Sequence, residues 1–186
     1  LLYGYWRSSS SYRVRIALNL KGIAYRQQPV HLVQGGGQQN LPAYRAVNPL
    51  GLVPALVHGD RVIVQSVAIC EYLEEVFPEP ALLPPDAAGR ARVRAIVQTI
   101  ASEIQPLNNL GVLRCLEQDL GQTEAAVRRW YAHWVERGFA ALVVQFLEAI
   151  EAIATEPHDL ARLRDAPQRL RQLQQPVHFG LAVALQ

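Results

Sequence analysis

The feature that most restricts how this chain can fold is a pair of closely spaced proline clusters. Pro78-Glu79-Pro80 and Pro84-Pro85-Asp86 flank residues 81–83. Proline lacks the N–H that a helix needs and clashes with the preceding turn, so no helix can continue through both clusters. Because the sequence patterns on the two sides differ, we predict a linker at residues 79–87. It would separate a first domain at residues 1–78 from a second domain at residues 88–186.

The residues before the linker alternate short strand-like patterns with longer helix-like ones, which is typical of an α/β unit. His58-Gly59-Asp60 forms a tight-turn pattern between two strands, and Ser66 is the predicted N-cap of the helix that follows them. The predicted strands cover residues 1–6, 25–32, 53–57 and 61–64, and the predicted helices cover residues 9–20, 40–46 and 66–77. The expected order is therefore βαβ, a glycine-containing loop, and ββα.

Beyond the linker the chain is rich in Ala, Leu, Arg and Gln and shows helical periodicity over residues 87–120 and 123–153. This pattern predicts an all-helical second domain, so the fold class is α/β plus all-α. Pro106 falls inside the first helical stretch and should kink it or divide it into two segments. Residues 154–186 are predicted to form shorter amphipathic pieces, broken by prolines.

Composition narrows the classes of function. The chain has 186 residues, 50% of them hydrophobic, and its net charge of +2 is spread without a basic run, so nothing indicates nucleic acid or a membrane as a partner. Cys70 and Cys115 are too few and too far apart for a disulfide framework, which suits a reducing cytoplasm. The five histidines lack a metal-binding spacing, so no metal is expected. Because the sequence contains no Met, we expect that it is not a complete translation product.

A run of four serines between the first strand and the first helix is a candidate anion site. Ser8 to Ser11 would lie where the free N–H groups and the dipole of the helix favour negative charge. A thiolate is such an anion, and a serine hydroxyl can donate a hydrogen bond to its sulfur. Taken alone, however, the four serines favour a simple helix cap.

Three further segments could bind a ligand, and each has an ordinary structural explanation. A cis bond at Val53-Pro54 would free the N–H and C=O of Val53 to pair with an extended peptide, although trans is the usual state. Gln65-Ser66, at the head of a helix, could receive a carboxylate or could only cap that helix. Gln38-Gln39 offers amide donors and acceptors, or is a plain surface loop.

Taken together, these segments resemble the glutathione transferases, and specifically their zeta class. The class motif is Ser-Ser-Cys-Ser, an aromatic residue and Arg-Val-Arg-Ile-Ala-Leu, and residues 8–18 match it except at Ser10. Further matches follow in order and extend the resemblance to about residue 150; they include Gly36-Gly37-Gln38-Gln39, Asn48-Pro49, Val53-Pro54, Gln65-Ser66 and Ile104-Gln105-Pro106-Leu107.

The resemblance implies the glutathione transferase fold, with a thioredoxin-like first domain and a helical second domain, and it implies a homodimer. It assigns Ser8 to hold the thiolate of glutathione, with Ser9 and Ser10 completing the anion pocket. The other implied glutathione contacts are Gln39, Val53, Pro54, Gln65, Ser66, Gln105 and Asn109. Arg7 is our candidate for a cation that binds a substrate carboxylate.

The resemblance also implies an activity, the glutathione-dependent isomerisation of maleylacetoacetate to fumarylacetoacetate in tyrosine and phenylalanine catabolism. A bound thiolate would add to the cis double bond and be eliminated after rotation, so glutathione would be returned unchanged. Two alternatives use the same thiolate, namely isomerisation of maleylpyruvate and conjugation of an electrophile. A non-catalytic binding module of the same fold is disfavoured, because a scaffold has no need of a complete glutathione site.

The chain departs from the family pattern in two places. Ser10 replaces the motif cysteine, which keeps a hydroxyl but argues against any role that needs a protein sulfur. After Ile150 the family's helix-opening Ser/Thr-x-x-Asp box and its substrate-side arginine are not found. Either the protein diverges there or residues are missing from this chain.

Overall fold

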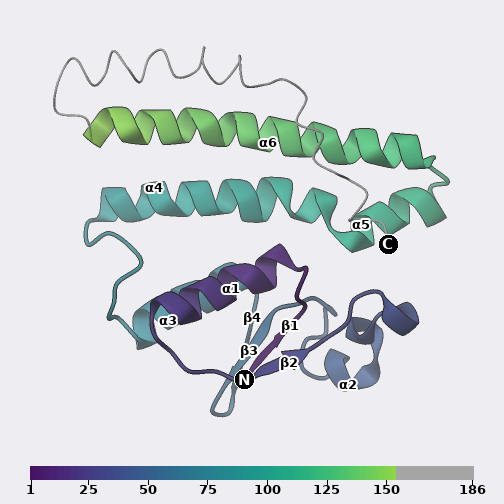
Figure 1. The fold of residues 1–186 in the computed structure, drawn as a ribbon, viewed down its shortest axis with the longest axis horizontal. Coiled ribbons are helices and arrows are strands. Elements are labelled where there is room, and N and C mark those ends of the chain that lie inside the picture. Colours follow the sequence, from purple (N-terminus) through teal and green to yellow (C-terminus); the bar gives the residue numbers. More distant parts are fainter. Residues whose placement is uncertain (154–186) are drawn as a thin grey trace. The chain divides into compact units, whose positions relative to one another are not determined.

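The computed structural model describes the chain from residue 1 to residue 153 (Figure 1). The predictions for residues 154–186 lie outside the described residues. The chain divides into two compact units, and the division falls between Pro106 and Leu107. The linker at residues 79–87, and the domain limits drawn around it, stay a prediction.

The first unit is built on a four-stranded mixed sheet in the order β2-β1-β3-β4. The central strand β1 is parallel to β2 and antiparallel to β3, and β3 is antiparallel to β4. The strands are β1 (Leu2–Gly4), β2 (Gln27–Pro29), β3 (Ala55–His58) and β4 (Arg61–Val64). This order confirms the predicted βαβ and ββα halves.

Two helices cover one face of this sheet (Figure 1). They are α1 (Ser9–Leu20) and α3 (Ser66–Val76), and α1 begins and ends at the predicted residues. Their apolar stripes meet the inward side chains of β1 and β3 in a core of Leu2, Val14, Ala17, Leu18, Leu56, Ile69 and Leu73. Neighbouring strand residues point to opposite faces. Tyr3 therefore turns to the other side of the sheet and packs on Tyr44 of α2 (Pro42–Arg45), with ring centres 5.8 Å apart.

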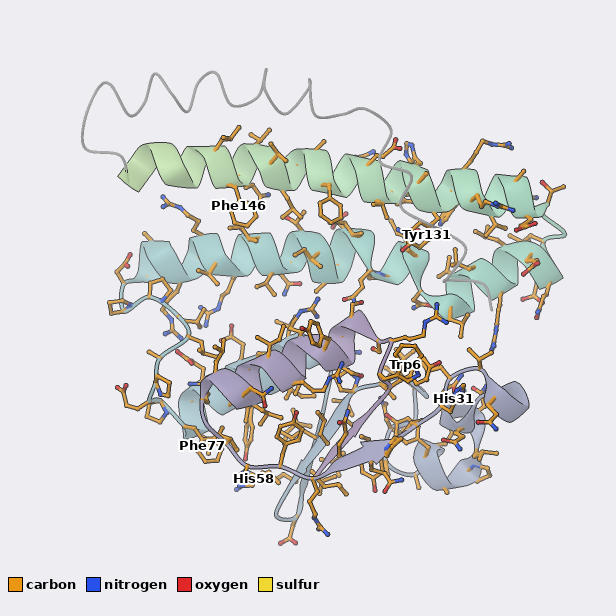
Figure 2. All side chains as sticks on the ribbon, in the orientation of Figure 1. Trp6, His31, His58, Phe77, Tyr131 and Phe146 are labelled. Atoms are coloured by element: carbon orange, nitrogen blue, oxygen red, sulfur yellow. The ribbon has the colours of Figure 1, made fainter. Side chains whose placement is uncertain are left out.

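The rest of the first unit is helical and begins after the proline-rich segment. It contains α4 (Ala87–Gln98) and a π-helical turn over Thr99–Ile104. Asp86 caps α4, because its Oδ1 accepts a hydrogen bond of 2.8 Å from the N–H of Gly89. At the far end of α3, Phe77 lies beside His58, with ring centres 5.6 Å apart (Figure 2).

The described part of the second unit is helical, as predicted. It contains α5 (Leu110–Arg114), a π-helical turn over Cys115–Asp119, and α6 (Glu124–Ile153). Pro106 starts a 3-10 turn that separates α5 from the helical stretch before it, which confirms the predicted division. Trp130 donates a 2.8 Å hydrogen bond to the carbonyl of Leu107, and its ring packs on Trp134. None of the described helices is both long and apolar enough to cross a membrane.

A buried ion pair fastens α1 to α3 and to the proline-rich segment. Lys21 Nζ, at the C-terminal end of α1, lies 2.7 Å from Glu74 Oε2 of α3, and the two side chains are 0% and 9% exposed. Lys21 also donates to the carbonyls of Phe77 and Pro80, and Glu74 accepts from the N–H groups of residues 82–83. Burial alone would raise the pKa of Glu74, but the hydrogen bonds from Lys21 and the backbone hold it below its ordinary value.

Replacing Lys21 with Met should lower the free energy of unfolding by about 3–5 kcal/mol, because a buried carboxylate then loses its cation. The double variant Lys21→Met/Glu74→Leu should recover part of this loss, since no buried charge is left unpaired. The recovery is incomplete because the backbone groups bound by the two side chains lose their partners. Urea unfolding at neutral pH measures the stability of both variants and of the single variant Glu74→Leu. A double variant as unstable as the sum of its two single variants would contradict the role given to the pair.

The lowered pKa of Glu74 fixes the sign of a pH effect. A carboxyl group with a lower pKa in the folded state stabilises the fold above its unfolded pKa, and that contribution is lost as the pH falls through the folded value. Below about pH 4.3, the ordinary value for glutamate, the parent chain should therefore lose stability faster than the double variant does. Parallel urea titrations from pH 7 to pH 3 test this; equal slopes for the two proteins would refute it.

Candidate functional site

The first wall of the candidate site is the N-terminus of α1. Ser8 is the N-cap, and its Oγ accepts a 3.1 Å hydrogen bond from the N–H of Ser11. This confirms that a serine of the run caps the helix. A hydroxyl group has one proton to donate as well as two acceptor positions. The cap therefore leaves the Ser8 proton available to a ligand.

The second wall is the N-terminus of α3, where one prediction is wrong. Ser66 is not the N-cap but the first helical residue, and Gln65 occupies the cap position without a side-chain cap. Gln65 has φ 68° and ψ 116° and is the one non-glycine residue in the described chain with a positive φ. Such a conformation costs on the order of 1–3 kcal/mol and is concentrated at functional sites.

Arg13 joins these two helix ends, and the sequence analysis missed it. Its Nη1 donates to Ser66 Oγ at 2.5 Å, and its Nη2 donates to Gln105 Oε1 at 3.0 Å. The Nε2 of Gln105 in turn donates to Ser9 Oγ. Two signals in the sequence could have found it. Arg13 belongs to the matched class motif, and its spacing from Ser10 places the two residues one turn apart on the same side of α1.

A cavity of about 410 Å³ lies among these groups. Four predicted site residues line it, namely Ser10, Gln65, Ser66 and Gln105. The lining also includes Val67, Ala68, Glu71, Gln98, Ala101 and Ser102, to which the sequence analysis gave no role. Ala101 and Ser102 of the lining belong to the π-helical turn that ends just before Gln105. Such turns are frequent at functional sites.

Glu71 is held in the cavity wall by an arginine. Arg94 of α4 donates to both carboxylate oxygens, at 2.9 and 2.6 Å. The hydrogen bond from Arg94 lowers the pKa of Glu71, so Glu71 is a carboxylate at neutral pH. Among the described residues no group of three or more His, Cys, Asp and Glu side chains gathers as a metal site.

The loop before β3 holds the Val53 backbone, and the cis peptide bond at Val53-Pro54 is confirmed. The carbonyl of Leu52 accepts from Tyr44 Oη at 2.6 Å and from Asn48 Nδ2 at 2.7 Å, which fixes the residue just before Val53. Burial raises the pKa of Tyr44 to about 12, so its phenol keeps the proton that it donates. Within the described residues the N–H and C=O of Val53 make no hydrogen bond.

Gln39 lies in the loop after β2, outside the lining of the cavity. Its Nε2 donates to the carbonyl of Leu32 at 3.1 Å, while its buried Oε1 has no partner in the described chain. Gly37, at φ 96°, makes this packing possible, because a Cβ there would stand 2.7 Å from the Leu32 carbonyl oxygen. A buried acceptor without a partner is costly unless a ligand or water supplies a donor.

Seven predicted residues lie outside the cavity lining, namely Ser8, Ser9, Gln39, Val53, Pro54, Arg7 and Asn109. Arg7 precedes α1, with its guanidinium carbon 5.6 Å from the ring centre of Trp6, which is labelled in Figure 2. Asn109 belongs to the second unit and caps α5 by accepting from the N–H groups of Gly111 and Val112. The structure therefore brings Ser9, Ser10, Gln65, Ser66 and Gln105 together, and the roles assigned to all the predicted residues stay predictions.

Comparison with known proteins gives a consistent result. The family model described as glutathione S-transferase, N-terminal domain, matches residues 2–81. The chain is 51% identical to the maleylacetoacetate isomerase of Pseudomonas aeruginosa over 142 residues. The aligned region covers 76% of this chain and 66% of that protein. The chain thus spans slightly less than two thirds of the length of the curated relatives that it matches.

Solved structures agree. A bacterial maleylpyruvate isomerase, described as a zeta-class glutathione S-transferase in its holo form, is 38% identical with a TM-score of 0.72, covering 89% of this chain and 90% of that chain. A maleylacetoacetate isomerase from Methylobacterium extorquens AM1, with bound malonate and glutathione, is 39% identical with a TM-score of 0.74, covering 77% of this chain and 67% of that chain.

The conformation of Gln65 gives a prediction about stability. Gln65→Gly and Gln65→Ala both remove the amide, but only glycine adopts a positive φ without strain. The relief of strain favours the glycine variant, whereas the greater entropy of its unfolded chain opposes it. The net expectation is that the glycine variant is more stable than the alanine variant by about 1 kcal/mol. Thermal unfolding of the two variants measures the difference. An alanine variant that is the more stable of the two would contradict the strained backbone.

Proposed function

Because the chain belongs to the zeta class of the glutathione S-transferase family, we propose that it is a glutathione-dependent cis–trans isomerase. The substrate that we propose is maleylacetoacetate, and the product is fumarylacetoacetate. The observation that carries the proposal is the meeting of two helix N-termini, with Ser10, Ser66 and Gln105, around one cavity. Such a place favours an anion and offers directed hydrogen-bond donors to it.

The groups present fit glutathione, which is a peptide with a thiol and carboxylates. A peptide backbone needs a donor and an acceptor, and Val53 offers both with no hydrogen-bond partner in the described part of the chain. A ligand N–H could also satisfy the buried Oε1 of Gln39. The γ-glutamyl end needs anion donors, and the hydroxyl of Ser66 at the head of α3 supplies one. In the first unit the tripeptide would thus be held by Gln39, Val53, Pro54, Gln65, Ser66 and Gln105, and the family resemblance adds Asn109.

In this proposal the protein's own groups bind, orient and stabilise charge. Bound glutathione would supply the thiolate that adds reversibly to the cis double bond of the substrate. The hydroxyl of Ser8 would donate a hydrogen bond to the sulfur, and the first-turn N–H groups of α1, near Ser9 and Ser10, would add positive potential. Each unit by which these groups lower the thiol pKa corresponds to about 1.4 kcal/mol of preference for the thiolate. Arg7 binds a substrate carboxylate and keeps the double bond oriented.

A second candidate activity is that of a maleylpyruvate isomerase. It is favoured by the match to a solved bacterial maleylpyruvate isomerase, because that match covers 90% of the other protein's chain. The two reactions need the same thiolate chemistry and differ in the group beyond the double bond. Conjugation of electrophiles would use the same site but consume glutathione. Product identity and thiol balance therefore separate the three activities.

The test is a spectroscopic assay of maleylacetoacetate and of maleylpyruvate with catalytic amounts of glutathione, following product and free thiol together. Isomerisation of maleylacetoacetate at the higher kcat/KM, without loss of thiol, is the expected result. A preference for maleylpyruvate would select the second candidate. Stoichiometric loss of thiol would overturn the isomerase proposal in favour of a conjugating transferase.

Ser8→Ala should lower kcat by about a hundredfold, because one preorganised donor to the reacting centre is lost. Glutathione binding, measured by calorimetry, should change little, because the rest of the peptide keeps its partners. Unchanged turnover in Ser8→Ala would remove Ser8 from the proposed mechanism.

Ser8 also caps α1, so the loss of the cap needs its own controls. Ser8→Asp keeps a capping oxygen but has no proton to donate, and it should be as inactive as the alanine variant while remaining more stable. Asp86→Ala removes the cap of α4, outside the cavity lining, and should lose about 1 kcal/mol of stability without losing activity.

We further propose that the protein is a cytoplasmic homodimer. The support is the family resemblance and, for the compartment, the two cysteines, which are both free. Sedimentation equilibrium of the purified chain tests the oligomeric state. A monomer at micromolar concentration would contradict the homodimer.

A further inference from the structure

We propose that Arg13 is a positioning residue for the proposed glutathione site, and that it orients the hydroxyl and amide groups that receive the γ-glutamyl end. This inference rests on the proposed function, because it concerns the same ligand. It adds a residue that acts through Ser66 and Gln105 rather than by touching the reacting atoms.

The geometry is a bridge between three segments that are far apart in the sequence. One arm of the guanidinium donates to Ser66 Oγ at 2.5 Å and the other donates to Gln105 Oε1 at 3.0 Å, across 53 and 92 residues of sequence. Gln105 continues the bridge to Ser9. One side chain of α1 thus fixes the head of α3 and the end of the π-helical turn relative to the serine run.

The bridge also decides which way the protons point. A guanidinium group can only donate, so each partner must present a lone pair to it. Ser66 Oγ accepts from Arg13 and therefore directs its own proton elsewhere, which makes it a donor suited to a carboxylate. Gln105 presents its carbonyl oxygen to Arg13, which turns its amide nitrogen to Ser9 and fixes an orientation that an amide would otherwise leave open.

Arginine suits this place better than lysine does. The bridge needs two donors at a fixed angle, and a planar guanidinium group provides them, whereas an ammonium group is a point charge on a flexible stem. Burial lowers the pKa of Arg13, but arginine starts so high that the side chain stays charged at neutral pH. Its charge therefore adds to the positive potential of the helix N-terminus at the place where a γ-glutamyl carboxylate would lie.

The test compares two ligands that differ only at the γ-glutamyl end. Calorimetry gives the dissociation constants of the whole protein for glutathione and for cysteinylglycine, which lacks the γ-glutamyl group. In the parent chain glutathione should bind more tightly. In Arg13→Gln this preference should shrink about tenfold or more, because a charged hydrogen-bond partner is lost from that end alone. The KM for glutathione should rise while kcat changes much less.

Three further variants separate positioning from a general loss of structure. Arg13→Lys keeps the positive charge but loses the two fixed donors of the guanidinium group. Its preference for glutathione over cysteinylglycine should therefore fall between those of the parent and of Arg13→Gln. It also provides the test if Arg13→Gln fails to fold. Arg15→Gln removes the same charge from the same helix, where the guanidinium instead contacts the carbonyl of Trp6, and should leave the preference unchanged. In a Ser66→Ala/Gln105→Ala background, Arg13→Gln should have a much smaller effect on the preference for glutathione, because both hydrogen-bond partners are already absent and only the charge is lost.

An unchanged preference in both Arg13→Gln and Arg13→Lys, with the parent chain binding glutathione, would overturn this inference alone. A full additional loss in the Ser66→Ala/Gln105→Ala background would overturn it too, since Arg13 would then act by another route. Failure of the parent chain to bind glutathione would overturn the proposed function and this inference together.

Discussion

The apolar contact between α1 and α3 over one face of the sheet is the constraint on which the candidate site depends. Val14 and Leu18 of α1 meet Ile69 and Leu73 of α3 above Leu2 of the central strand, and all five are at most 1% exposed. With their stripes fixed in this way, the two helices begin close enough together for a single arginine side chain to span the distance. The dipoles of both helices then point at the same cavity.

Hydrogen-bonded charged side chains further fix the positions of α1 and α3. At one end of α1, Lys21 and Glu74 fasten the helices to the proline-rich segment, and near the other end Arg13 links Ser66 to Gln105. Both are hydrogen-bonded charged groups that are at least partly buried, and such groups are costly to disturb because any partner left behind is unpaired. The first arrangement holds the fold, and we infer that the second orients a ligand.

The candidate site also carries the features that a stable fold would avoid. Gln65 stands at a positive φ. Within residues 1–153, Gln39 buries an acceptor without a partner and Val53 leaves both of its backbone groups without a hydrogen bond. The strained backbone of Gln65 and the unpartnered acceptor of Gln39 lower stability in the chain alone. A bound peptide would supply partners for Gln39 and for the backbone groups of Val53. All three residues are predicted glutathione contacts, so these features add to the physical support for the proposed function.

Most helices and strands, and the family, could be predicted from the sequence, because the sequence signals for them are local. Helical spacing and capping serines placed α1, and the strand patterns with their turn gave the ββ hairpin before α3. The resemblance that begins at the serine run led to the family, and Pro106 marked a break in the helical region. Proline and capping residues act on their own neighbours, so their effects survive without knowledge of the fold.

The sequence by itself determined the order of the elements, the family and the residue types that the site would need. Only the tertiary structure decided that Arg13 joins Ser66 to Gln105 and that Gln65, rather than Ser66, occupies the cap of α3. The physical reason is range. A bridge across 53 and 92 residues depends on how helices pack and leaves no periodic trace. A strained backbone is imposed by its surroundings against the preference of the residue itself.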